Sequence, residues 1–251
     1  MAAAALAGCG GKTPVAKGGG DVRAEEAGYL APPTPDAVRL AGTGVSLSGS
    51  APAGGRLRLA TPGGQALFAD ADDKGRWTLA MGALAEPRIY GLSVMLKGRG
   101  AQAEGYVLLT PQGEAALLRA GAGARRIDAS GHYGVRTIDF DRGGGVEVSA
   151  MTPPGAQVLL HIDGRLAAQG QADDRGHYDA SLPAPGSTTA IRPGAHRVQV
   201  SGDGFADTVA FRVSPPQPLA QGPVRSQLTP AGLRVDWMTP GGGVQSTILV
   251  R

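Results

Sequence analysis

The chain has 251 residues, of which 41 are glycine and 19 are proline, and it carries a formal net charge of +3. This length accommodates two domains of roughly 100 residues each and a tail. No apolar run approaches the ~20 residues of a membrane-spanning helix. Lysine and arginine are scattered rather than clustered with aromatic residues, so no nucleic-acid partner is expected.

The N-terminal residues 1–9 end at Cys9, the only cysteine of the chain, which excludes an internal disulfide. The tetrad Leu-Ala-Gly-Cys that ends at Cys9 resembles a bacterial lipobox. That resemblance implies that Cys9 is lipidated, that it becomes the new N-terminus, and that the lipid holds the protein in a membrane. The residue after Cys9 is Gly10 and not aspartate. By the same resemblance this implies the outer membrane, on its periplasmic face or at the cell surface.

The signal that should precede Cys9 is incomplete, because a basic segment and a full-length apolar segment are missing. We therefore expect the recorded start to lie downstream of the true one. An unstructured alanine-rich leader with an incidental thiol is the alternative. Residues 10–36 have no apolar periodicity and are rich in glycine, proline and charge, which predicts a flexible tether.

Two stretches of the chain, residues 45–81 and 146–182, align without a gap and agree at 11 of 37 positions. Most identities are turn residues, and most conservative changes fall at apolar positions. A repeat of this kind indicates a duplicated β-rich module. Both copies contain Ala-Asp-Asp, a basic residue and glycine, at residues 71–75 and 172–176.

Short alternating segments with turn residues every eight to twelve positions predict the strands of an antiparallel sandwich. In the first module these segments are 38–40, 45–48, 56–59, 65–68, 77–81, 89–96 and 106–110. Residues 108–119 predict an edge hairpin, because Pro111 and Gly113 lie at its centre. Residues 120–126 are mostly small and predict a linker.

The order Ser-x-x-x-Pro-x-Gly, an alternating strand, and Ala-Asp-x-x-Gly-x-aromatic resembles the bacterial Ig-like repeats of envelope and surface proteins. In the first module it begins at Ser48 and ends at Trp77. The resemblance implies an all-β fold with two tandem Ig-like antiparallel β-sandwich domains, at 37–127 and 128–251. It implies an adhesive, spacer or docking role and assigns no catalytic residue.

The later part of the second module realigns with the first at an offset of 104, which places three extra residues in the loop 183–194. Surface loops carry function more often than strands do, so Thr188, Thr189 and Arg192 are candidate binding residues there. Residues 232–250 resemble the segment from Gly134 onward, and both contain three consecutive glycines between alternating strands. A terminal hairpin is therefore expected, and its Trp237 is either a core residue or a candidate exposed contact.

No catalytic or metal-binding set emerges from the sequence. The four histidines have no metal-ligand spacing, and Lys74 and Met81 occupy positions where a calcium loop needs oxygen ligands. We therefore expect no cofactor, no metal and no enzyme activity.

The expected function is that of an outer-membrane lipoprotein that acts as an envelope scaffold, spacer or protein-docking module. The alternative is a module that binds a glycan, either peptidoglycan or a surface polysaccharide. Exposed rings would favour the glycan, and the rings in question are Trp77, Tyr133, Tyr178 and Trp237.

Overall fold

The computed structural model describes residues 29–42, 44–128, 132–182 and 191–251. Every regular element among these residues is a β-strand, and neighbouring strands of each sheet pair in the antiparallel direction. Ala31–Arg251 form one compact unit. Cys9, Thr188 and Thr189 lie outside the described residues.

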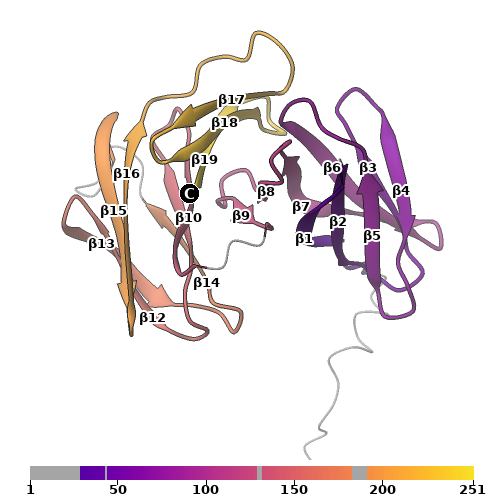
Figure 1. Ribbon diagram of the computed structural model, residues 1–251, viewed down its shortest axis with the longest axis horizontal. Coiled ribbons are helices and arrows are strands. Elements are labelled where there is room, and N and C mark those ends of the chain that lie inside the picture. Colours follow the sequence, from indigo (N-terminus) through magenta and orange to yellow (C-terminus); the bar gives the residue numbers. More distant parts are fainter. Residues whose placement is uncertain (1–28, 43, 129–131, 183–190) are drawn as a thin grey trace, which may run out of the picture. The chain divides into compact units, whose positions relative to one another are not determined.

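The first half of this unit contains two sheets (Figure 1). One has the strand order β1-β2-β5, with β1 Thr34–Ala41, β2 Gly44–Ser50 and β5 Arg76–Met81. The other has the order β4-β3-β6-β7-β8-β9, with β3 Arg56–Ala60, β4 Ala66–Asp70, β6 Arg88–Leu96, β7 Arg99–Leu109, β8 Ala115–Leu118 and β9 Arg125–Arg126.

The second half repeats this plan. One sheet has the order β13-β12-β15-β16, with β12 Gln157–Ile162, β13 Arg165–Gln171, β15 Gly194–Gly202 and β16 Phe205–Val213. The other has the order β14-β11-β10-β19-β18-β17, with β10 Gly134–Phe140, β11 Val146–Met151, β14 His177–Leu182, β17 Val224–Thr229, β18 Gly232–Met238 and β19 Val244–Val250.

In each half the first, second and fifth strands share one sheet, and the fourth, third, sixth and seventh share the other. This is the strand arrangement of Ig-like sandwiches, in which alternate residues of both sheets point into a common core. The predicted fold class, two tandem Ig-like antiparallel β-sandwiches, is confirmed. The hydrogen-bonded sheets fall on either side of Asp128, yet one compact unit contains both, so the predicted domain boundaries stay a prediction. β1 begins at Thr34, within the stretch assigned to the tether, because Thr34 already pairs with Ser50 of β2.

The duplication is visible in backbone detail as well as in strand order. The first strand of each module has a register shift at the same place, between Pro35 and Ala37 and between Val135 and Thr137. The turn before the fifth strand is closed alike in both, since Ala51 donates to the Gly75 carbonyl at 2.8 Å and Thr152 donates to that of Gly176 at 2.8 Å.

The aspartates shared by the two copies stabilise this turn. The carboxylate of Asp72 accepts hydrogen bonds from the backbone N–H groups of Lys74 at 2.9 Å and Arg76 at 2.8 Å. In the second copy Asp173 accepts from the backbone N–H groups of Arg175 and His177 at the same two distances. A side chain that accepts backbone bonds in this way specifies a turn, which accounts for the Asp-x-x-Gly pattern.

Of three further sequence-based expectations, the structure bears out one and differs from two. The predicted hairpin at 108–119 is confirmed as β7 and β8, joined by a turn in which Gly113 donates to the Thr110 carbonyl. The predicted linker 120–126 was wrong in part, because β9 pairs with β8 and Ala124 is buried. The offset of 104 also fails as a register for the sixth strands, since Leu57 pairs with Val94 but its counterpart Val158 pairs with Gly202.

The central strands β10, β19 and β18 of their sheet are buried on both faces. One face belongs to the sandwich core with β12, β15 and β16, which includes Ile138, Phe140 and Ile248. The other face contributes to a second apolar cluster with residues of the first half of the chain, which comprises Ile89, Leu108, Ala116, Leu118, Ala124, Leu233, Val235, Trp237 and Leu249. All seven residues of β10 are buried as a result.

Candidate functional site

The sheet of β10, β19, β18 and β17 has six strands, whereas the sheet that faces it has four. β10 packs against β15 and β16. Because β16 is the last strand of its sheet, β19, β18 and β17 continue past that edge. The inner face of these strands therefore needs another cover, and polar side chains supply part of it.

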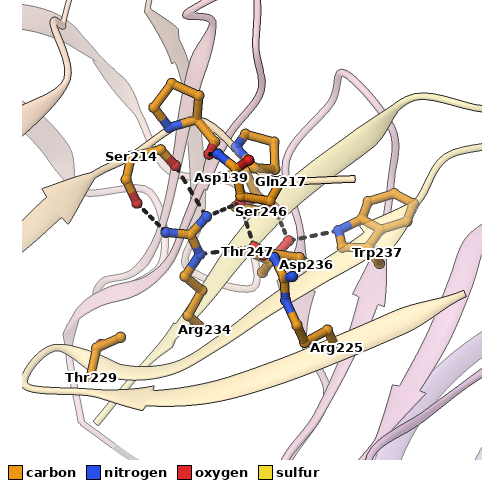
Figure 2. A network of polar contacts seen from close by, with 12 residues as sticks. Asp139, Ser214, Gln217, Arg225, Thr229, Arg234, Asp236, Trp237, Ser246 and Thr247 are labelled. Atoms are coloured by element: carbon orange, nitrogen blue, oxygen red, sulfur yellow. Dashed lines mark hydrogen bonds and ion pairs between the residues drawn. The ribbon is translucent and has the colours of Figure 1, made fainter. Parts of the chain in front are cut away.

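Arg234 of β18 is the centre of this polar network (Figure 2). Its guanidinium donates to Asp236 at 2.8 Å, to the Ser246 hydroxyl at 2.9 Å and to the Ser214 carbonyl at 3.1 Å. It also bonds to the Ser214 hydroxyl, and it lies 5.1 Å from the centroid of the Phe140 ring. One planar cation thereby connects β18, β19, β10 and the segment after β16.

Asp236 is the buried anion of the same network. It accepts from Ser246 at 2.7 Å and from Arg225 at 2.5 Å, in addition to Arg234. Burial alone would raise the pKa of Asp236, but the hydrogen bonds from Ser246, Arg225 and Arg234 outweigh it and hold the pKa below its usual range. Asp236 is therefore charged at neutral pH and compensated by two arginines.

A second chain of polar groups lies on the opposite face of the same sheet. The indole of Trp237 donates to the Thr247 hydroxyl at 3.1 Å, and that hydroxyl bonds to Asp139. Asp139 also accepts from the backbone N–H of Ala124 at 2.8 Å. Complete burial raises the pKa of Asp139 to about 6, against the opposing effect of these hydrogen bonds.

Glu147 of β11 is the direct cross-strand neighbour of Asp139. Burial, together with the negative charges of Asp139 and Asp141, raises the pKa of Glu147 to about 7. Two neighbouring carboxyl groups with raised pKa values are a combination that general acid–base catalysis uses. Here, however, Asp139 is 0% exposed and is occupied by Ala124 and Thr247, so no substrate reaches it in this structure.

An apolar cleft of about 440 Å³ lies at the end of β16. Buried Phe211, Ala231 and Ile248 line it from within, and Leu228, 63% exposed, lies on its rim together with Gln227 and Arg212. Its walls come from β16, from the turn between β17 and β18, and from β19. The sequence contained no signal for this cleft, because it arises where strands from different parts of the chain meet.

Of the predicted binding residues, Arg192 and Trp237 lie within the described ranges. Arg192 is exposed, and its carbonyl oxygen lies 2.6 Å from Nε2 of His196. Trp237 is 0% exposed, so the alternative of an exposed contact is wrong and the core alternative is right. The indole is buried because the face of β18 that holds it packs against Tyr106 and its neighbours, with the two rings 6.2 Å apart.

The other rings that would stack on a sugar are mostly buried too. Trp77 is 2% exposed and Tyr178 is 6% exposed, whereas Tyr133 is 51% exposed and lies against Phe205. A glycan surface uses rings that face solvent, so this arrangement counts against a stacking platform.

Within the described ranges, no group of three or more His, Cys, Asp or Glu side chains could hold a metal ion. The same residues include no helix that is long and apolar enough to cross a membrane.

No protein-family model and no curated protein matches this chain. Thirteen chains of known structure match it. A biofilm-associated protein BSP domain matches with a TM-score of 0.25 and 14% identity over 76% of this chain, which spans 30% of that one. The central fibronectin-III array of RIM-binding protein matches with a TM-score of 0.27 and 13% identity over 87% of this chain and 89% of that one. A pullulanase of Group B Streptococcus matches with a TM-score of 0.21 and 12% identity over 70% of this chain and 23% of that one. Likenesses of this level carry no information on activity or partner.

Proposed function

We propose that this protein is a non-enzymatic docking or spacer module of the bacterial cell envelope, anchored in the outer membrane through a lipid on Cys9. The docking role is supported by the contacts of the aspartates in Ala31–Arg251. Four aspartates make their hydrogen bonds to other groups of the same fold. Asp72 and Asp173 close turns, and Asp139 and Asp236 connect strands. What remains for a partner is the surface and the free edges of two Ig-like sandwiches.

The joint between the two sandwiches supports a spacer role, because it is made of specific contacts rather than of a free linker. Arg126 donates to the Val250 carbonyl at 2.5 Å, and the Thr137 hydroxyl donates to the Ala124 carbonyl at 2.7 Å. Arg119 and Arg125 both bind Asp179, at 3.0 and 3.3 Å. Hydrogen bonds of this number restrict motion at the joint, as a module that keeps two surfaces at a constant separation requires.

The lipid anchor is tested by metabolic labelling with palmitate in a bacterial host, comparing the natural chain with Cys9→Ala. We expect label only in the natural chain and a shift of Cys9→Ala out of the outer-membrane fraction. Equal label in both proteins would remove the anchor from the proposal.

A protein partner and a glycan partner are separated by sedimentation with insoluble peptidoglycan over a range of salt concentrations. We expect the protein to stay in the supernatant at salt that screens its small net charge. Retention at high salt would instead favour the glycan function, with Tyr133 as the first residue to replace, since its ring is the most exposed of the four candidate rings.

A further inference from the structure

The two modules diverge at the end of their seventh strands. In the first module the chain turns tightly at Thr110–Gly113 and returns as β8, which pairs with Tyr106–Leu109 at the edge of β7. In the second module the corresponding residues are Ser214, Pro215, Pro216 and Gln217. This segment makes no return strand and leads instead to β17, which belongs to the other sheet.

The edge that β8 covers in the first module is therefore uncovered in the second. Among the described strands, β16 pairs with β15 alone. The start of β16 is shielded, because Asp207 accepts the backbone N–H of Val135 at 2.9 Å and Phe205 packs on Tyr133. The end of the strand, residues 209–213, is left with a row of backbone groups that an added strand would bond.

The apolar cleft lies beside this same edge. Its floor of Phe211, Ala231 and Ile248 belongs to the sandwich core or its rim, and Leu228 borders it. An antiparallel strand laid along β16 would cover the overhanging β19 and β18 and would direct every second side chain toward this floor. The first module shows the kind of sequence that fits, since β8 reads Ala-Ala-Leu-Leu and is buried throughout.

We propose that residues 209–213 of β16 and the adjoining cleft form a strand-addition site, which receives an extended segment of a partner protein with small and aliphatic side chains. Such a segment gains affinity from main-chain hydrogen bonds and specificity from the side chains that enter the cleft. The shielded start of β16 disfavours a second copy of this chain, because two β16 strands could align only over their short free ends. The proposal deepens the docking function above and rests on it only in assigning a partner protein as the occupant.

The test uses the full isotopically labelled chain and, as probe, a blocked peptide with the sequence of residues 112–119, which contains β8. We expect saturable amide shifts confined to 209–213 and 227–231, with a dissociation constant on the order of 100 µM for so short a strand. The same peptide with proline in place of Ala116 should produce no shifts, because proline lacks a donor and cannot lie inside a ladder.

Leu228→Ser should weaken binding by about fivefold through the lost apolar contact. Leu166→Ser is the matched control, because Leu166 is 49% exposed on β13, the opposite edge of the same sheet, and its binding should equal that of the natural chain. Unchanged melting of both variants shows that each still folds. Absence of shifts at millimolar peptide, or shifts at other residues, overturns the proposal, as does a dimer in sedimentation that Leu228→Ser dissociates. None of these readouts depends on Cys9, so failure of the anchor and failure of this site are distinguishable.

Discussion

The indole Nε1–H of Trp237 donates to the Thr247 hydroxyl at 3.1 Å, and the same hydroxyl bonds to the carboxylate of Asp139. This series of hydrogen bonds thus connects three neighbouring strands, β18, β19 and β10, through side chains that are fully buried. In such surroundings a hydrogen bond that is lost is not replaced by water. The stability of this face therefore depends on individual side chains.

Trp237→Phe should lower the free energy of unfolding by about 2 kcal/mol, through lost volume and a lost hydrogen bond. Trp77→Phe is the matched control, because the buried Nε1 of Trp77 has no hydrogen-bond partner among the described residues. The control should lower the free energy of unfolding by less, since it loses packing contacts and no hydrogen bond. Urea unfolding followed by the remaining tryptophan measures both, and equal losses would contradict the role of the Thr247 bond.

Arg234→Met should destabilise the protein by about 3 kcal/mol, because it leaves the buried Asp236 with only one arginine and removes the bonds to Ser214 and Ser246. Arg225→Met removes the other arginine, whose side chain is 48% exposed, and should cost under about 1 kcal/mol. Thermal and urea unfolding of the two variants check this order. A reversed order would show that Arg225, and not Arg234, is the centre of the network.

Glu147 should make stability depend on pH. Its folded pKa of about 7 lies above the value of 4.5 for an ordinary glutamate, so between these values the native state binds more protons than the unfolded state. The contribution of Glu147 to the free energy of unfolding is fully present below pH 4.5 and is lost as the pH rises through 7. Glu147→Gln should weaken this decline and leave the part that comes from the raised pKa of Asp139. At pH 8 its free energy of unfolding should exceed that of the natural chain by about 1 kcal/mol, after allowance for the partial exposure of the carboxyl.

Urea unfolding between pH 4 and pH 8 measures this difference. Glu104→Gln, on an exposed part of β7, is the control and should leave the pH profile of the natural chain unchanged. Parallel profiles for Glu147→Gln and the natural chain would contradict the prediction.

Gly75→Ala should destabilise the first module by about 2–3 kcal/mol. The glycine has φ of +72°, and an added Cβ would lie 2.4 Å from the carbonyl oxygen of Ala51. Gly64→Ala shares the positive φ, at +88°, but meets nothing within 4 Å, so it should cost only the backbone strain of about 1 kcal/mol. Differential scanning calorimetry compares the two, and equal shifts in melting temperature would remove the steric argument.

Little of the candidate site could be predicted from the sequence. Arg234 and Asp236 alternate with apolar residues on a predicted strand, which is also the pattern of a solvated face. The structure buries Asp236 and leaves Arg234 half-buried, because β18 is one of the central strands of a sheet that are covered on both faces. The cleft beside β16 exists because no return strand follows Val213. The sequence indicates this only by prolines in the second module, at the positions that correspond to Gln112 and nearby residues of the first module.

The sequence by itself determined the duplication, the strands, the hairpin after Leu108 and the turns at Asp72 and Asp173. These features follow from local chemistry: the alternation of apolar residues, the carboxylates that accept backbone bonds, and glycines at positive φ. Only the tertiary structure decided that Trp237 is core, that Ala124 and β9 are part of the packed joint rather than a linker, and that the last three strands extend one sheet past its partner. Those outcomes depend on contacts between residues more than 100 positions apart, such as Arg126 with Val250, and no local pattern specifies which faces such contacts will bury.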